Sequence, residues 1–266
     1  MKKLDGKVAI VAGGGRDIGR AVSVKLAAEG AKVVVNYYND EVQATETHDA
    51  IEAVGGQAIL VAGDMTKQEE VDRLVAEAKA AYGDKVDILV NVVGGLVARK
   101  TLDEMDMEFF EYLMRLNVTS TFLLTKAVVP LMTSGGSIIN FASQAGRDGG
   151  GPGASAYAAS KGAVMTFTRG MAKELGPQNI RVNALCPGMI STSFHDTFTK
   201  DQVRTNVAAG TPLRREGKAA EVADTVAYLA SDEASFLTGV NLDINGGLIM
   251  SLCGKLFFPI LTKSEI

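Results

Sequence analysis

Three polar side chains of this sequence could act together on one substrate oxygen: Ser143, Tyr157 and Lys161. Tyr157 and Lys161 are four residues apart, and residues at that spacing share one face of a helix. An ammonium group beside a phenol stabilises the phenolate, so we expect Lys161 to lower the pKa of Tyr157 from its ordinary value of about 10. Tyr157 could then exchange a proton with a substrate near neutral pH. Ser143, which follows an apolar run, could hydrogen-bond the same substrate oxygen. A surface helix without function could carry the same Tyr-x-x-x-Lys pair, so the assignment depends on the rest of the chain.

The elements that would position these side chains follow from alternating short apolar runs and longer amphipathic segments. We expect strands at residues 8–12, 32–36, 58–62, 88–91, 137–141, 181–186 and 240–244. We expect helices at residues 18–29, 40–54, 67–82, 107–132, 154–175 and 219–230. Thr66 and Glu69 have the spacing of a capping box at the start of the third helix.

This alternation predicts an α/β fold: a single Rossmann-type, doubly wound parallel sheet of about seven strands with helices on both faces. No Pro/Gly/Ser-rich linker divides the chain. We therefore expect residues 1–250 to form one dinucleotide-binding and catalytic domain, followed by a C-terminal extension at residues 251–266.

The turn after the first predicted strand, residues 12–19, is rich in glycine. Glycines let a backbone approach a pyrophosphate, which a helix N-terminus then stabilises, although such a turn can also serve tight packing alone. The spacing departs from G-x-G-x-x-G, because Gly13 and Gly19 are six apart. The second strand ends without an acidic residue before Asp40 to bind a ribose 2′-hydroxyl. Arg16 could bind a 2′-phosphate, against the opposing charge of Asp17, so the sequence favours NADPH, with NADH possible.

Composition excludes several classes of protein. The chain has 266 residues, 47% of them hydrophobic and 22% charged, and a net charge of −4, which is typical of a globular protein with a substantial core. It has no long basic block for nucleic acid, and no run of the ~20 apolar residues that a membrane helix needs. Its start does not resemble a signal peptide, and Cys186 and Cys253 lack metal-ligand spacing. We expect a cytoplasmic enzyme with no metal site, no membrane contact and a small-molecule substrate.

Taken in order, these motifs resemble the short-chain dehydrogenase/reductase family from about residue 4 to residue 247. The resemblance implies a catalytic set of Asn117, Ser143, Tyr157 and Lys161. Tyr157 would be the general acid in reduction, Ser143 would polarise the carbonyl, and Lys161 would lower the pKa of Tyr157 and bind the nicotinamide ribose. Asn117 would hold a water that connects Lys161 to solvent. The family commonly forms homotetramers on the helices that carry Asn117 and Tyr157.

The resemblance also implies a cofactor site. Its residues would be Gly13, Gly15, Arg16, Asp17, Ile18, Gly19, Asn36, Tyr37, Asp64, Met65, Asn91, Gly94, Tyr157, Lys161, Pro187, Gly188, Ile190 and Thr192. Three departures from the family pattern stand out: Ala12 where Thr is frequent, Asp17 where Gly is usual, and Val92-Val93 in place of Asn-Ala. The first two lie near the expected phosphates and could change cofactor affinity or preference.

The loops beyond the strands should hold the substrate. Gln144, Arg147 and His195 are the predicted substrate residues, with Arg99 as a further candidate cation. Together with the glycine-lined stretch at residues 149–153 they favour a compact, anionic substrate, although most such charges face solvent in proteins.

The loops at residues 94–100, 149–153, 193–195 and 243–247 resemble a branch that includes alginate-pathway reductases. Those enzymes reduce 4-deoxy-L-erythro-5-hexoseulose uronate to 2-keto-3-deoxygluconate. A 3-oxoacyl-[acyl-carrier-protein] reductase is the alternative enzyme. A cofactor-binding regulatory protein without catalysis is the alternative outside enzymes, and the complete set of catalytic residues argues against it.

Overall fold

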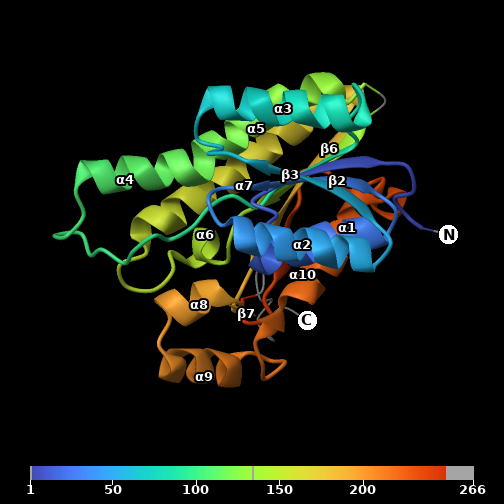
Figure 1. Cartoon of the computed structure of the whole chain (residues 1–266). Coiled ribbons are helices and arrows are strands. Elements are labelled where there is room, and N and C mark those ends of the chain that lie inside the picture. The colour runs from blue at the N-terminus through green and yellow to red at the C-terminus, as the bar shows by residue number, and fades with distance from the viewer. Residues whose placement is uncertain (1, 134, 250–266) are drawn as a thin grey trace, which may run out of the picture.

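A seven-stranded parallel sheet forms the centre of the molecule (Figure 1). The computed structural model describes residues 2–133 and 135–249, so the predicted extension at 251–266 lies outside the described residues. The strands run in the order β3-β2-β1-β4-β5-β6-β9. Their bounds are β1 (Val8–Ala12), β2 (Lys32–Tyr37), β3 (Gln57–Ala62), β4 (Ile88–Asn91), β5 (Gly136–Phe141), β6 (Ile180–Pro187) and β9 (Asn241–Ile244).

Helices cover both faces of this sheet, as the alternating sequence pattern predicts. One face carries α1 (Asp17–Ala28), α2 (Glu41–Ala53) and α10 (Ala219–Ala230), and the other carries α3 (Gln68–Tyr82), α5 (Ser120–Val128) and α7 (Ser155–Leu175). Every residue of β1 is buried, because apolar side chains of this strand pack against helices on both sides. The predicted doubly wound α/β fold is therefore confirmed.

The direction of strand order reverses between β1 and β4, which are neighbours in the sheet but not in the sequence. Ala12, the last residue of β1, lies opposite Asn91, the last residue of β4. The loops that leave these two strands diverge to opposite faces of the sheet. In open parallel sheets this is the point at which ligands bind, beyond the carboxyl ends of the strands.

The long helix expected at residues 107–132 is interrupted. It consists of α4 (Met107–Met114), a π-helical turn η1 (Arg115–Thr119), α5, and a 3₁₀ turn η2 (Val129–Leu131). Single π-turns inside helices are frequent at functional sites. The predicted capping box of α3 is wrong: the Thr66 hydroxyl donates to Asp64 Oδ1 at 2.7 Å, and α3 begins without a side-chain cap.

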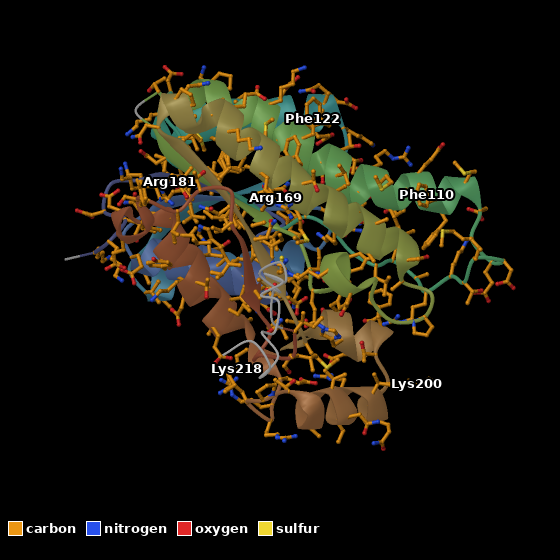
Figure 2. The ribbon with its side chains drawn as sticks, turned by 180° about the vertical axis from the view of Figure 1, so that it is seen from behind. Phe110, Phe122, Arg169, Arg181, Lys200 and Lys218 are labelled. Atoms are coloured by element: carbon orange, nitrogen blue, oxygen red, sulfur yellow. The ribbon has the colours of Figure 1, made fainter. Side chains whose placement is uncertain are left out.

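Residues 189–218, which sequence patterns leave as loop, contain secondary structure. We call them the α8–α9 segment, after α8 (Ser193–Phe198) and α9 (Asp201–Gly210). The short strands β7 (Ile190–Ser191) and β8 (Gly217–Lys218) pair at the two ends of this segment. It extends away from the sheet, and Figure 2 shows Lys200 at the turn between its two helices.

Arg204 links the parts of the α8–α9 segment to one another. Its Nε lies 2.7 Å from Glu216 Oε1, its Nη2 lies 2.7 Å from Glu216 Oε2, and its Nη1 pairs with Asp196. Three further short elements complete the described chain: α6 (Ala145–Asp148), η3 (Gly176–Gln178) and η4 (Asp232–Ala234).

Candidate active site

The structure brings Ser143, Tyr157 and Lys161 together at the carboxyl end of β5. Ser143 lies two residues beyond this strand, and its side chain is hydrogen-bonded to that of Tyr157 on the first turn of α7. Lys161, one turn further along α7, is buried and donates from Nζ to the Phe141 carbonyl at 2.7 Å. Its Nζ lies 5.8 Å from the centroid of the Tyr157 ring. A carbonyl substrate could therefore receive hydrogen bonds from Ser143 and Tyr157 on one oxygen.

The pKa of Tyr157 is raised above its ordinary value in this structure, mainly by burial, although its hydrogen bond with Ser143 opposes the rise. This direction is opposite to the one expected from the spacing of Tyr157 and Lys161. The physical reason is that the protein removes the phenol from water, which disfavours phenolate, while the Lys161 ammonium points to the Phe141 carbonyl. Burial also lowers the pKa of Lys161 to about 8.

Asn117 lies inside the π-turn η1, fully buried beside Lys161. Its Oδ1 accepts from the Gly95 amide at 2.9 Å, and its Nδ2 donates to the carbonyls of Gly95 and Leu113 at 3.1 and 3.0 Å. A Cβ on Gly94 would come within 2.5 Å of Asn117 Oδ1 and 2.8 Å of Lys161 Nζ, so only glycine fits there. Asn117 thus braces the loop after β4 against the catalytic lysine, and its role in holding a water stays a prediction.

The glycine-rich turn between β1 and α1 is built for close backbone approach. A Cβ on Gly19 would lie 2.0 Å from the Gly13 carbonyl oxygen, which excludes any side chain at that position. Buried Asn36 supports the turn: its Oδ1 accepts from the Gly13 amide at 3.2 Å and its Nδ2 donates to the carbonyls of Val61 and Gly63. The Asn36 side chain therefore has a structural role, and a contact of Asn36 with a cofactor stays a prediction.

The residues present fit a dinucleotide. The turn meets the N-terminus of α1, where backbone amides and the helix dipole favour a pyrophosphate. Among the described residues, the buried Lys161 ammonium has a single carbonyl acceptor, and an ammonium carries three donors. Two donors are left for the hydroxyls of a ribose. Arg16, in the same turn, has a 64% exposed side chain.

Two of the expected cofactor residues turn their side chains into the core. Asn91 is 1% exposed and its Nδ2 donates to Asn140 Oδ1 at 2.8 Å, so its side chain ties β4 to β5. The side chain of Met65 is 2% exposed and packs in the hydrophobic core between the sheet and α3. The Asn91 Oδ1 has no hydrogen-bond partner among the described residues, and contacts of Asn91 and Met65 with a cofactor stay predictions. By contrast, Asp64 lies at the carboxyl end of the sheet and accepts from the Thr66 amide and hydroxyl.

The loop after β6 borders the same site. The Pro187 carbonyl accepts from the Gln144 amide at 3.0 Å, and the Gly188 amide donates to the Ile244 carbonyl at 3.0 Å. Ile190 is buried against α10, while the Thr192 hydroxyl donates to the Ile190 carbonyl. Close to Gly188, the buried Oε1 of Gln144 has no hydrogen-bond partner among the described residues.

Helix α8 brings an aromatic side chain to the catalytic tyrosine. The Phe194 ring centroid lies 6.3 Å from that of Tyr157 and 5.1 Å from that of His195. His195 Nδ1 lies 2.9 Å from Thr199 Oγ1. Burial, and then the charges of Arg204 and Arg99, lower the pKa of His195, so its imidazole is neutral at pH 7. Phe194 was not expected from the sequence, which offers no signal for it beyond its place next to His195.

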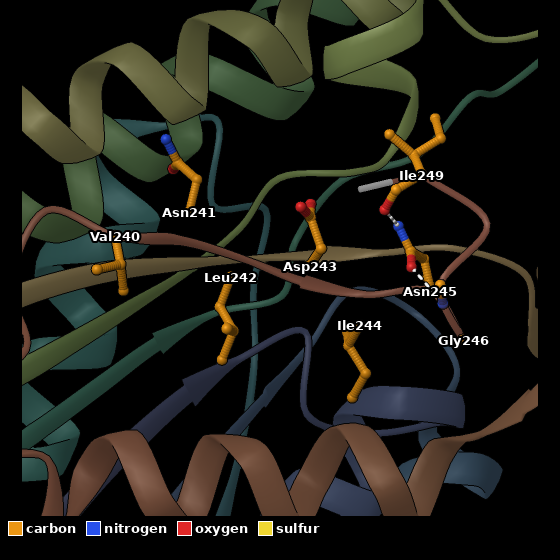
Figure 3. A pocket seen from close by; sticks show the side chains of 9 residues that line it. Val240, Asn241, Leu242, Asp243, Ile244, Asn245, Gly246 and Ile249 are labelled. Atoms are coloured by element: carbon orange, nitrogen blue, oxygen red, sulfur yellow. Dashed lines mark hydrogen bonds between the residues drawn. The ribbon is translucent and has the colours of Figure 1, made fainter. Parts of the chain in front are cut away.

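Arg147 does not face a substrate, contrary to the sequence-based expectation. Its Nε lies 2.5 Å from Asp243 Oδ1, and its Nη2 donates to the Asn241 carbonyl at 2.5 Å. Figure 3 shows the strand β9 that receives it: Asp243 points to one side, while Leu242 and Ile244 point toward α10, as the two-residue period of a strand requires. Arg147 therefore fastens α6 to β9.

Arg99 is the remaining candidate cation at the mouth of the site. It is exposed, its Nη1 donates to the Pro152 carbonyl at 3.0 Å and its Nε donates to the Phe198 carbonyl at 3.2 Å. No carboxylate partner is found for it among the described residues. Other cations of the neighbouring loops are paired with acids: Lys100 with Asp106, Arg204 with Glu216, and Arg215 with Glu221.

Comparison with known proteins agrees with this geometry. The family model described as "Enoyl-(Acyl carrier protein) reductase" matches residues 12–249. The chain belongs to the short-chain dehydrogenase/reductase family. As in this family generally, it is an NAD(P)-dependent oxidoreductase acting on C=O or CH–OH groups. No helix among residues 2–133 and 135–249 has the length and apolar character needed to cross a membrane.

Individual members of the short-chain dehydrogenase/reductase family resemble almost the whole chain. A 3-oxoacyl-[acyl-carrier-protein] reductase of Synechocystis is 38% identical over 254 residues, covering 94% of this chain and 100% of the relative. Versicolorin reductase 1 of Aspergillus parasiticus is 37% identical over 256 residues, covering 92% and 97%. The solved short-chain dehydrogenase/reductase of Serratia marcescens superposes with a TM-score of 0.87 at 33% identity, covering 92% of this chain and 99% of that one.

Proposed function

We propose that this enzyme reduces the carbonyl group of a small, anionic, sugar-derived substrate with NADPH. The observation that carries the proposal is Arg99: an exposed guanidinium at the mouth of the site, hydrogen-bonded to two carbonyls and to no described carboxylate. A substrate carboxylate in the site would lose water, and an arginine fork supplies the charge-assisted hydrogen bonds that compensate for that loss. The neutral His195 and the unpartnered Oε1 of Gln144 offer hydrogen bonds to substrate hydroxyls.

Each catalytic side chain has a defined task in this reaction. A bound reduced nicotinamide would supply the hydride for the carbonyl carbon. Ser143 donates a hydrogen bond to the carbonyl oxygen, and Tyr157 gives that oxygen its proton as negative charge develops on it. Lys161, charged below its pKa of about 8, would bind the ribose hydroxyls, and its ammonium, 5.8 Å from the centroid of the Tyr157 ring, would favour the negative charge that develops there during the reaction. The raised pKa of Tyr157 keeps the phenol protonated at neutral pH, as a general acid requires.

The best candidate substrate is 4-deoxy-L-erythro-5-hexoseulose uronate, which would be reduced to 2-keto-3-deoxygluconate. It combines an aldehyde with a carboxylate in one short molecule. Arg99 is tied to Phe198 on one side and to Pro152 on the other, so the α8–α9 segment and the glycine-rich loop meet beside it. This arrangement supports a compact substrate rather than a long acyl chain.

NADPH is the proposed cofactor because Arg16 is exposed beside the glycine turn and β2 ends in Tyr37 rather than in an acid. A guanidinium can bind a 2′-phosphate with two parallel hydrogen bonds. NADH would lose this interaction but keep the contacts of the pyrophosphate and of the nicotinamide ribose.

A 3-oxoacyl-[acyl-carrier-protein] reductase is the second candidate, favoured by the Synechocystis relative of that name. A substrate screen separates the two. Initial rates would be measured with the uronate, a neutral aldehyde of similar size and acetoacetyl thioesters, each with NADH and NADPH. A kcat/KM at least about tenfold higher for the uronate supports the proposal, whereas a preference for the thioesters supports the second candidate.

A homotetramer and a cytoplasmic location remain part of the proposal. Support for subunit contact comes from α5 and α7, where Phe122, 45% exposed, makes an edge contact with Phe167 at 6.5 Å between ring centroids (Figure 2). Two aromatic rings on neighbouring exposed helices would be covered in an assembly that joins these helices. Sedimentation velocity of Phe122→Lys beside the unmodified protein tests this surface.

A further inference from the structure

Asp17 makes a contact that links two distant parts of the chain. It is the first residue of α1, directly after the glycine turn. Its Oδ1 accepts from the Ser193 amide at 3.0 Å, and its Oδ2 accepts from the Ser193 hydroxyl at 2.5 Å. Ser193 is the first residue of α8, and the residue before it, Thr192, provides no side-chain cap for this helix. The carboxylate of Asp17 therefore serves α8 as a cap supplied from 176 residues away.

Asp17 also has two unfavourable effects, one on the backbone conformation at residue 17 and one on the charge near the expected pyrophosphate site. Its φ of +49° is in the left-handed region, which costs a non-glycine residue about 1 kcal/mol or more, although Asp tolerates it better than most. Its negative charge also stands at the N-terminus of α1, where a dinucleotide pyrophosphate would bind. Arg16 offsets this charge weakly, because the two side chains are 3.8 Å apart and the Arg16 side chain is 64% exposed.

Helix α8 is held at both ends by charges of the sign that a helix dipole favours. The carboxylate of Asp17 lies at its first residue, and the guanidinium of Arg99 binds the carbonyl of its last residue, Phe198. Between these ends, Phe194 lies against Tyr157. The hydrogen bonds of Asp17 and Arg99 at the two ends of α8 therefore fix the position of the Phe194 ring beside the catalytic tyrosine.

We propose that Asp17 is a positioning residue that holds α8 over the catalytic tyrosine through Ser193, and that its charge weakens dinucleotide binding. The cofactor turn and the substrate-covering helix are joined by one carboxylate, so a change at residue 17 affects both with opposite signs. This inference concerns the cofactor site and α8, and it holds for whichever carbonyl compound the enzyme reduces.

Three variants separate the charge from the hydrogen bonds. Asp17→Gly removes both and relieves the left-handed backbone. Asp17→Asn removes the charge but keeps an oxygen that can accept from the Ser193 amide, and Asn also tolerates a positive φ. Ser193→Ala keeps the carboxylate and removes one donor. Each is compared with the unmodified enzyme by NADPH fluorescence titration and by amide hydrogen exchange of residues 193–199 without cofactor.

We expect Asp17→Gly and Asp17→Asn to bind NADPH about three- to tenfold more tightly, from the loss of one like charge near the pyrophosphate. Hydrogen exchange across α8 should rise severalfold in Asp17→Gly and change little in Asp17→Asn. Ser193→Ala should raise exchange without tightening NADPH. A residue with only a structural role would instead weaken NADPH binding and loosen α8 together.

Two results would overturn the proposal: NADPH affinity that does not increase in either Asp17 variant, or exchange of α8 in Asp17→Gly equal to that of the unmodified enzyme. If exchange of α8 is too fast to compare, Asp17→Gly and Ser193→Ala are combined in a double-mutant cycle, and the thermal unfolding midpoint of each variant is measured. Additive effects would mean that the two residues do not interact and would also overturn it.

Discussion

The buried ammonium of Lys161 should make the stability of the protein depend on pH in a way that one substitution removes. Burial lowers the pKa of Lys161 from 10.5 to about 8, a difference that corresponds to about 3 kcal/mol. The native state thus holds this proton less tightly than the unfolded chain does. The free energy of unfolding therefore rises with pH from about 8 and stops rising near 10.5.

Lys161→Met keeps most of the side-chain volume and removes the titrating group. At pH 7 it should change stability little, because the relief of burying a charge is opposed by the loss of the donor to the Phe141 carbonyl, worth about 1–3 kcal/mol. Between pH 7 and pH 9.5, however, the unmodified protein should gain about 2 kcal/mol relative to the variant. Titrating groups that do not interact with Lys161 cancel in the difference; Cys186, whose thiol interacts with Lys161, makes a smaller contribution that differs between the two proteins.

Urea denaturation of both proteins without cofactor, at pH 7.0 and 9.5, measures this difference directly. Lys126→Met is the matched control, because Lys126 is exposed on α5 and its loss should leave the pH dependence unchanged. If the stabilities of the unmodified protein and Lys161→Met run parallel between the two pH values, within about 0.5 kcal/mol, the ammonium is not desolvated in the way the structure indicates.

Other predictions concern the reaction itself. Tyr157→Phe should lower kcat by about 10²–10⁴-fold while NADPH binding by fluorescence titration survives; near-normal turnover would exclude Tyr157 as the acid. Arg16→Ala should raise the KM for NADPH about tenfold and leave that for NADH unchanged, and an equal effect on both would remove Arg16 from the 2′-phosphate site. Arg99→Ala should raise the KM of the uronate by about ten- to a hundredfold and that of a neutral aldehyde much less. Arg147→Ala, by contrast, should lower the thermal midpoint and weaken both substrates alike, since it fastens α6 to β9; a selective loss of the uronate would restore it to the substrate site.

The sheet could be predicted from the sequence because each strand carries its own signal. Val8–Ala12 and its counterparts are short apolar runs between amphipathic helices, and such local patterns survive in the fold. The catalytic group could be predicted because Tyr157 and Lys161 lie on a single helix, at a spacing that the helix itself converts into proximity.

What could not be predicted depends on contacts between distant parts of the chain. The direction of the pKa shift of Tyr157 is decided by burial, which spacing does not report. The hydrogen-bond partners of Arg147, Asn241 and Asp243, lie 94 and 96 residues away on β9. The residues near Arg147 in the sequence do not predict these contacts. The π-turn at Asn117 interrupts a segment whose sequence pattern is continuously helical. The buried side-chain amide of Asn117 donates a hydrogen bond to the Leu113 carbonyl, which would otherwise accept from a backbone amide of the helix.

The two ends of the α8–α9 segment are joined to each other, so the segment could be exchanged as a unit to change the substrate, in evolution or in the laboratory. Arg204 and the pairing of β7 with β8 join the parts of residues 189–218 to one another. The corresponding segment of a relative could be grafted between β6 and α10. Such a graft would change neither the glycine-rich turn nor the catalytic residues Asn117, Ser143, Tyr157 and Lys161. Two of its ties to the rest of the chain, at residues 17 and 99, lie far upstream, so a graft that ignores them would leave α8 without the hydrogen bonds at its two ends.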